Sequence, residues 1–245
     1  MSGTVSNLWR HPIKSHGRET LSQVTVIPGQ TMPGDRVWAV AHEAAKTDGS
    51  DWAPCSNFTR VAKAPELAAI SAELQDERVT LRHPDRPDLL FAPDTEQEVF
   101  LDWVKPLIPA DRAAPDRIVR VPGRGMTDSD FPSISLCNMA SHRAVEQKLG
   151  QSLSTVRWRG NIWFDGLPLW EEFDWLGRDV RIGQAVFRIR ERITRCMATT
   201  ANPETGARDA DTLGALSNWG HQDFGVYAEV IQGGEVRLND EVRVL

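Results

Sequence analysis

The sequence predicts a mainly β protein of the α+β class, with two β-barrel-like domains, a few short helices and a site at the domain interface. Short runs with strand character, most of them bounded by Gly, Pro or Asp, outnumber the helical patterns. The length of 245 residues suits one large or two small domains. A stretch rich in Pro, Arg and Gly at residues 109–126 separates two halves. We therefore expect one domain over residues 1–120 and a second over residues 121–245.

The first half contains four strand candidates and one helix candidate. The strand candidates are QVTVIPG, RVWAVAHE, RVTLRHP and LLFAP. Residues 95–108 have a helical pattern, with Thr95 as the candidate N-cap and Glu98 three residues later. Because proline lacks a backbone N–H, we expect Pro106 to end or kink this helix.

The second half alternates helix and strand patterns. In FPSISLCNMASHRAVEQKLG, Ser141 is the candidate N-cap of a helix that runs to Lys148, and Gly150 lies just past its end. STVRWRGNIWF and DVRIGQAVFRIRERITR predict strands, and DADTLGALSNW predicts a short helix. YAEVIQGGEVRLNDEVRVL predicts a hairpin that turns at Gly233 and Gly234.

Composition and charge argue against several classes of protein. A net charge of -6 and a pI near 5.6 disfavour a nucleic-acid binder, which needs basic faces for phosphate contacts. There is no secretory signal peptide and no apolar run of about 20 residues that could span a membrane. We therefore expect a cytoplasmic protein without membrane or nucleic-acid partners. Nothing indicates an oligomerisation helix, so a monomer is compatible with the sequence.

The three cysteines are far apart in the sequence. Cys55, Cys137 and Cys196 form no CxxC pair, so we expect neither a zinc knuckle nor a bound iron–sulfur cluster. Cys196 lies beside Arg195 in RITRCMATTANPETGAR, at the end of a predicted strand. One face of an unbroken strand would carry Arg188, Arg190, Arg192, Thr194 and Cys196.

Two interpretations of Cys196 follow from the local residues. Nearby guanidinium groups favour the thiolate, which can act as a nucleophile, a persulfide carrier or a soft metal ligand. The hydroxyls and backbone amides of the following ATTANPETG stretch suit an oxyanion or a phosphate. The alternative is an inert, half-buried cysteine at a strand end, and the local chemistry alone favours this alternative.

Three further stretches carry cations and amides that could bind a phosphate-bearing ligand, although solvent-exposed loops are their default interpretation. The stretches are HPIKSHGRE, PGDRVW and VRWRGNIWFDG. Their candidate residues are Lys14, Ser15, Arg36, Arg157, Arg159 and Asn161.

The motifs taken together resemble a known family. TRCMATTANPETG resembles the central motif of MOSC domains, named after the C-terminal domain of molybdenum cofactor sulfurases. VSNLWRHPIKSHGRE, MPGDRVWAVAHE and NFTRVAKAPELAAISAEL resemble the β-barrel domain that precedes MOSC, and VRWRGNIWFDGLPLWEEFDW resembles the Arg-x-Asn stretch of the family. Order and spacing agree over nearly the whole chain. The layout is most similar to the amidoxime-reducing components and their bacterial counterparts.

The resemblance implies a molybdenum-pterin cofactor, as molybdopterin or its nucleotide form, bound between the two domains. It makes Cys196 the metal ligand and the catalytic residue, which reverses the local interpretation, and leaves Cys55 and Cys137 as packing residues. The cofactor contacts that it implies are Lys14, Ser15, Arg36, Arg159, Asn161, Arg195 and Thr199. Three features depart from the family pattern and bear on substrate preference: His16, the NFTR stretch ending at Arg60, and Gly160.

The implied activity is reduction of N-hydroxylated or N-oxide small molecules by removal of oxygen. No cysteine follows Cys196, so we expect electrons from a separate ferredoxin, cytochrome or flavoprotein. Two alternatives stay open: a sulfur carrier with a persulfide on Cys196, and a non-catalytic protein that binds or delivers the cofactor. A pyridoxal phosphate association of the MOSC type also stays open.

Overall fold

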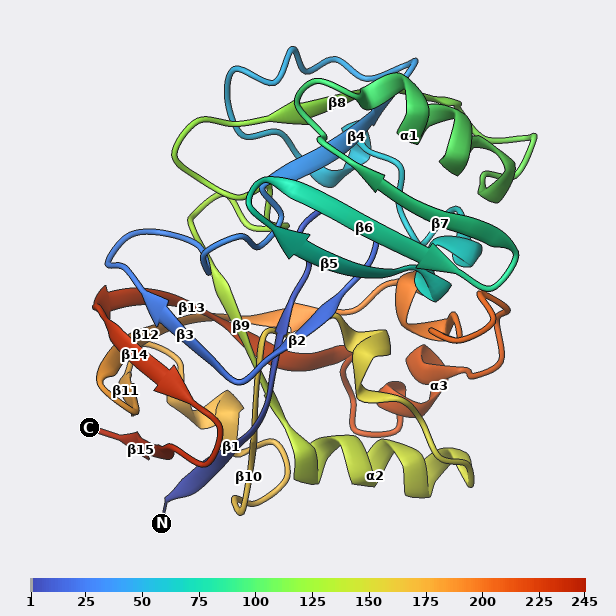
Figure 1. Cartoon of the computed structure of the whole chain (residues 1–245). Helices are drawn as coiled ribbons and strands as arrows, with labels where there is room; N and C mark the ends of the chain where they lie inside the picture. Colours follow the sequence, from blue (N-terminus) through green and yellow to red (C-terminus); the bar gives the residue numbers. More distant parts are fainter. Residues whose placement is uncertain (1) are drawn as a thin grey trace.

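The computed structural model describes residues 2–245 as two lobes (Figure 1). The barrel lobe is built on a closed seven-stranded β-barrel and carries the helices α2 (Met139–Leu149) and α3 (Thr212–Ser217). The sheet lobe lies above it in Figure 1 and contains the strands β4 to β8 and the helix α1 (Gln97–Val104). The mainly β prediction is confirmed. No helix within residues 2–245 is long and apolar enough to cross a membrane.

The barrel closes because its first strand pairs on both sides. Its members, in order around the ring, are β1 (Gly3–Arg10), β10 (Ile162–Asp165), β9 (Ile134–Asn138), β13 (Asp223–Gln232), β12 (Ala185–Thr194), β11 (Asp179–Ile182) and β15 (Glu241–Val244). The strand β1 pairs with β10 and β15, and β2 (Glu19–Leu21) extends the sheet beyond β1. Alternate side chains such as Leu8, Leu136 and Phe187 fill the interior.

The sheet lobe has two smaller sheets and its own apolar core. The strand β4 (Trp38–His42) pairs with β8 (Pro115–Arg120). The strands β5 (Ser71–Gln75), β6 (Arg78–His83) and β7 (Arg86–Phe91) form an antiparallel meander. The helix α1 contributes Phe100 and Trp103 to the core, which also contains Trp38, Leu81 and Phe91. These sheets stay separate within the described residues, so only the barrel lobe has a closed ring.

The two ends of the chain meet in the barrel lobe. The strand β3 (Gln23–Val26) pairs with β14 (Gly234–Arg237). The predicted hairpin at Gly233 and Gly234 is therefore wrong: β13 pairs with β9 and β12, and β14 leaves it to join β3. The physical reason is burial, because this pairing places Val24, Val26 and Val236 in the barrel core.

The helices follow the sequence patterns with two corrections at their starts. The helix α1 begins after Glu96 rather than Thr95, and ends before Pro106, which lies in the 3-10 turn η3 (Lys105–Leu107), as predicted. Asn138, not Ser141, caps α2, because its side chain accepts a hydrogen bond from the N–H of Ala140.

Most remaining expectations for the second half are confirmed. Gly150 ends α2 with φ of 68°, and α3 forms where a short helix was expected. DVRIGQAVFRIRERITR folds as the antiparallel pair β11 and β12. STVRWRGNIWF is only partly a strand, since its first half is the 3-10 turn η4 (Thr155–Trp158). The other 3-10 turns are η1 (Cys55–Asn57), η2 (Pro65–Ala69), η5 (Glu171–Trp175) and η6 (Met197–Thr200).

A cationic cavity between the lobes

A cavity of about 250 Å³ opens where the two lobes meet. Its lining comes from the β1–β2 and β3–β4 loops, the segment around η1, the turn η4 and the segment after β12. Seven of the predicted site residues line this single cavity: Lys14, Ser15, Arg36, Arg159, Arg195, Cys196 and Thr199. Their places in the sequence are far apart, so the fold supplies the convergence that spacing did not show.

Asn161 is not brought to this cavity. Its Nδ2 donates to the carbonyl of Trp9 at 3.2 Å, and its Oδ1 accepts from the hydroxyl of Ser135 at 2.8 Å and from the Ser135 N–H. Asn161 therefore connects the barrel strands β1 and β9, and it borders only a small neighbouring void. Its role as a cofactor contact stays a prediction.

Three of the lining residues have left-handed backbone conformations. Ser15, Arg36 and Arg159 have φ values of 66°, 52° and 53°. Non-glycine residues in this region cost on the order of 1–3 kcal/mol each and cluster at functional sites. The turn at Ser15 is supported by His16, a fully buried residue whose Nδ1 lies 2.7 Å from the carbonyl of Lys14. The backbone is thus strained at the three positions that bring these side chains to the cavity.

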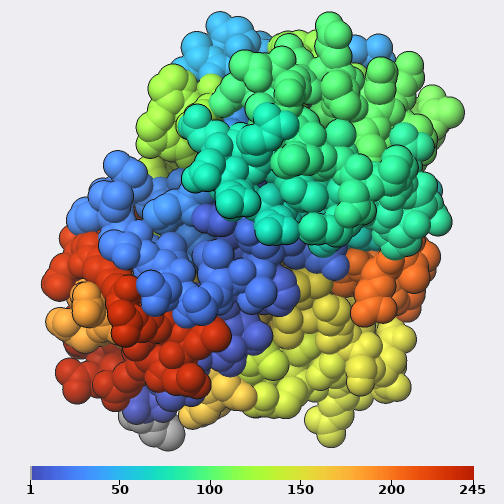
Figure 2. All heavy atoms as spheres, in the orientation of Figure 1, coloured from blue at the N-terminus to red at the C-terminus, as the bar shows by residue number. Residues whose placement is uncertain are grey.

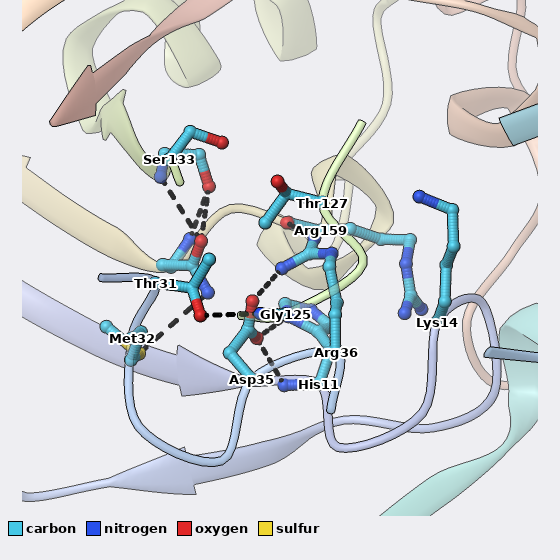
Figure 3. A network of polar contacts seen from close by, with 12 residues as sticks. His11, Lys14, Thr31, Met32, Asp35, Arg36, Gly125, Thr127, Ser133 and Arg159 are labelled. Atoms are coloured by element: carbon cyan, nitrogen blue, oxygen red, sulfur yellow. Dashed lines mark hydrogen bonds and ion pairs between the residues drawn. The ribbon is translucent and has the colours of Figure 1, made fainter. Parts of the chain in front are cut away.

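A buried carboxylate fixes Arg36 (Figure 3). Asp35 accepts a hydrogen bond from the N–H of His11 at 2.8 Å and forms an ion pair with Arg36. Burial alone would raise the pKa of Asp35, but the charge of Arg36 and the hydrogen bonds from His11 outweigh it and hold the pKa well below its usual range. Burial, with the charges of Arg159 and Arg36, lowers the pKa of His11 to about 3. His11 is therefore neutral at physiological pH, while Asp35 is a permanent anion.

Arg159 has no such partner. Its carbonyl accepts a hydrogen bond from Arg36 at 3.0 Å, but its own guanidinium makes only one long contact, 3.4 Å, to the carbonyl of Gly17. Within residues 2–245 it forms no ion pair with a carboxylate. Burial and the charge of Arg36 lower the pKa of Arg159 to about 9. Two half-buried guanidinium groups thus lie near each other, with Asp35 and Asp128 as the nearby carboxylates and, among the described residues, an ion pair formed by Arg36 alone, an arrangement that an anionic ligand would stabilise.

Lys14 is buried and partly engaged. Its Nζ donates to the carbonyl of Met126 at 2.7 Å and to Asp128 at 2.5 Å. Burial lowers the pKa of Lys14, although the charge of Asp128 opposes this shift. Because an ammonium group has three donors, one N–H of Lys14 is left for the cavity.

Two further arginines around the cavity, Arg195 and Arg157, bind groups of the protein itself. Arg195 donates to the carbonyl of Trp158 at 2.7 Å and to that of Phe224 at 2.9 Å. Arg157, which the sequence pattern placed among the candidate contacts of a phosphate-bearing ligand, donates to the carbonyl of Thr199 at 3.0 Å and pairs with Asp209 at 3.1 Å. Arg157 therefore stabilises the segment that follows Cys196.

Cys196 presents an exposed thiol at this cavity. It precedes η6, and its carbonyl accepts hydrogen bonds from the N–H and the hydroxyl of Thr199, both at 3.2 Å. The arginines of β12 have other partners: Arg188 pairs with Asp179, Arg190 pairs with Glu229, and Arg192 lies over the ring of Phe173. Register shifts in β12 also break the single face that strict alternation predicted. The cationic surroundings of Cys196 therefore come from the cavity, not from its own strand.

Sequence reasoning missed several lining residues, among them Cys55, Asp128 and Tyr227. Cys55, expected to be a packing residue, is half-buried in the cavity and accepts a hydrogen bond from Arg60 at 3.1 Å. Asp128 and Tyr227 also line it, and burial raises the pKa of the Tyr227 phenol. Only tertiary contacts reveal these residues, since each lies in an ordinary loop or strand pattern. Cys137, in contrast, is fully buried, which raises the pKa of its thiol to about 12.

No group of three or more His, Cys, Asp or Glu side chains within residues 2–245 is arranged to hold a metal ion. Fewer than three such side chains could therefore ligate a metal at this cavity, so the rest of its coordination would have to come from a bound group.

Two family models match the chain, and so do two curated relatives. The model described as MOSC N-terminal beta barrel domain matches residues 2–103, and that described as MOSC domain matches residues 126–243. Mitochondrial amidoxime-reducing component 1 of Mus musculus is 24% identical, and the alignment covers 99% of this chain and 82% of the relative. The Homo sapiens protein of the same name is 21% identical, with 99% and 83% covered. Among solved structures, the YuaD protein from Bacillus subtilis aligns with a TM-score of 0.49 at 12% identity, covering 100% of this chain and 96% of that one.

Proposed function

Because the chain belongs to the MOSC family and carries the MOSC N-terminal β-barrel domain beside the MOSC domain, we propose that it is a molybdenum-cofactor-dependent oxidoreductase. Its substrates would be N-hydroxylated or N-oxide small molecules, from which it removes oxygen. Electrons would come from a separate electron-transfer protein. The names of its relatives, amidoxime-reducing components, favour this reaction class.

One observation carries the proposal: an exposed thiol and a half-buried guanidinium without an ion-pair partner within residues 2–245 share one cavity. The residues fit a pterin cofactor with a phosphate and a metal. Arg159, Arg36 and the free N–H of Lys14 would bind the phosphate, because an anion there relieves the repulsion between the two guanidinium groups. Cys196 would ligate molybdenum, because its thiolate is a soft ligand at an accessible position.

The bound cofactor would supply the two-electron chemistry. The chain itself orients the ligand. Trp158 stacks on Phe224 with 3.9 Å between ring centroids and lies under the Arg195 guanidinium, so it forms a rigid wall. Tyr227 keeps its proton because burial raises its pKa, and its hydroxyl can donate a hydrogen bond to an N–O oxygen. Release of that oxygen as water consumes two electrons and two protons in total.

The metal and pterin content of the protein tests this proposal. We expect near-stoichiometric molybdenum and pterin in protein made in a host that synthesises the cofactor. Cys196→Ala should lose molybdenum or change its spectroscopic environment, whereas Cys55→Ala, a second thiol of the same cavity, should keep both. The loaded wild type should reduce an amidoxime with an artificial electron donor, and the Cys196→Ala variant should not.

Absence of both metal and pterin, even after reconstitution with free cofactor, would overturn the proposal. The exposure of Cys196 also favours one alternative, a persulfide carrier, since sulfur transfer needs an accessible thiol. A cyanide-labile sulfur on Cys196 in pterin-free protein would support that alternative. Tight cofactor binding without turnover would indicate a delivery protein. Pyridoxal phosphate is disfavoured because Lys14, the lysine of the cavity, is already bonded to Asp128 and Met126.

A further inference from the structure

A second pocket, of about 190 Å³, lies in the sheet lobe. Its polar lining contains three cations, Arg60, Lys63 and Arg112, together with His42 and Thr59. Among its lining residues within the described chain there is no Asp or Glu. Arg112 contacts only the exposed Asp111 next to it in sequence, at 3.5 Å, and exposed pairs of this kind are weak. The pocket therefore carries uncompensated positive charge.

Arg60 connects this pocket to the cavity between the lobes. It lines both, and its Nη1 donates to the sulfur of Cys55 on the cavity side. Its Nε is buried and has no hydrogen-bond partner within residues 2–245. Buried donors are almost always paired, by protein, water or ligand. A ligand that carries a hydrogen-bond acceptor could pair with the Nε–H of Arg60.

The rest of the lining selects the kind of anion. Phe58, Ala64, Ile108 and Ala113 give the pocket an apolar part. A free phosphate has no apolar surface to place there, whereas an organic acid has both a charged end and an apolar body. We propose that this pocket binds a small organic carboxylate, with its charge at Arg60, Lys63 and Arg112 and its body against Phe58 and Ile108. The site adds to the proposed oxidoreductase function and does not depend on it.

Calorimetric titration of the full-length protein with benzoate tests the site. We expect saturable binding at one site per chain, at least about tenfold tighter than that of benzamide, which has the same shape without the charge. Lys63→Ala and Arg112→Ala should each weaken benzoate binding about three- to tenfold. The matched control is Arg82→Ala, which changes an exposed arginine of β6 that pairs with Glu73 and Asp88 and does not line this pocket. This variant should bind benzoate as the wild type does.

Arg159→Gln separates the two cationic sites. It alters the cavity between the lobes and leaves the second pocket intact, so benzoate should still bind. Loss of benzoate binding in this variant, equal affinity for benzamide, or no saturation up to about 10 mM would each overturn the inference. The titration needs no cofactor, substrate or electron donor. A failed benzoate titration would therefore not contradict the proposed oxidoreductase function. A protein without molybdenum would likewise not contradict benzoate binding in this pocket.

Discussion

Arg36 and Arg159 share a residue type, a backbone conformation and a cavity, but they differ in their ion-pair partners. Both have left-handed backbones and both line the cavity, but only Arg36 has a carboxylate partner. The sequence pattern identified both as candidates. It could not distinguish them, because the difference depends on Asp35, whose burial beside Arg36 is a tertiary result.

Replacement of these two arginines should therefore change the free energy of unfolding in different ways. Arg36→Gln leaves Asp35 buried without its cation and should destabilise the protein by about 3–5 kcal/mol. Arg159→Gln removes an unpaired cation and should leave the free energy of unfolding unchanged or raised, while weakening binding of the proposed cofactor. Urea denaturation of both cofactor-free variants gives the comparison. Equal destabilisation by the two changes would contradict the assignment of Arg159 as unpaired.

Residues that the sequence could not place show why the candidate site was only partly predictable. Cys196, Lys14 and Ser15 were found because a family motif surrounds each of them. Cys55 and Tyr227 were missed because nothing in the loop or strand around them differs from ordinary structure. Arg195 was found, but its guanidinium binds two carbonyls of the barrel lobe, a role that no local pattern indicates.

At the scale of elements, the start of α2 is held by a buried acid. Glu172, which is fully buried, accepts a hydrogen bond from Asn138, the N-cap, at 2.9 Å and lies 3.4 Å from the hydroxyl of Ser141. Burial raises the pKa of Glu172 to about 7. Asn138 and Ser141 are both good capping residues, and the sequence favoured the wrong one, because the contact with Glu172 comes from a distant segment.

This acid should give the protein a specific pH dependence. Its folded-state pKa is above the ordinary value of 4.5, so the folded state binds more protons than the unfolded state between about pH 4.5 and 7. The contribution of Glu172 to stability is therefore present at low pH and is lost as the pH rises through this window, by up to about 3 kcal/mol. Glu172→Gln keeps an uncharged side chain and should abolish that decline.

Chemical denaturation of wild type and Glu172→Gln at pH 5 and pH 8 measures this effect as a difference between the two proteins. The comparison is needed because His11 and His16 have the opposite pH dependence. Burial lowers their pKa values to about 3 and 4, so they lower the free energy of unfolding as the pH falls below 6.5. A difference between the two proteins that does not change with pH would show that Glu172 is ionised throughout.

At the scale of the whole molecule, the positions of the strands were easier to predict than their pairing partners. Strand existence was predictable from alternation and turn residues, as for β6 and the pair β11 and β12. Partners were less predictable, because β3 with β14 and β1 with β15 pair across nearly the whole sequence. Figure 2 shows the blue N-terminal atoms lying against the red C-terminal atoms on one face. The boundary at residue 120 stays a prediction.

A fragment of residues 121–245 should not fold alone. It lacks β1, so β10 and β15 would become unpaired edges and the barrel core would lose Val5 and Leu8. Mixing it with a fragment of residues 1–120 should restore a dispersed two-dimensional NMR spectrum. A cooperative unfolding transition from the isolated second fragment would contradict this expectation. Intact protein cut at residue 120 by an engineered protease site serves as the control for the effect of the break itself.

The closure of the barrel by β1 has a consequence for synthesis in the cell. The strand β1 is made before the other barrel strands and β15 after them, so the β1–β15 pairing that completes the ring waits until the rest of the barrel has been translated. At 5–20 residues per second this delay is on the order of tens of seconds. The sheet lobe, whose strands pair among themselves, can form during that time. Until β15 is made, β1 can pair with β2 and β10, but its edge at Gly3 and Thr4 lacks the partner that closes the ring.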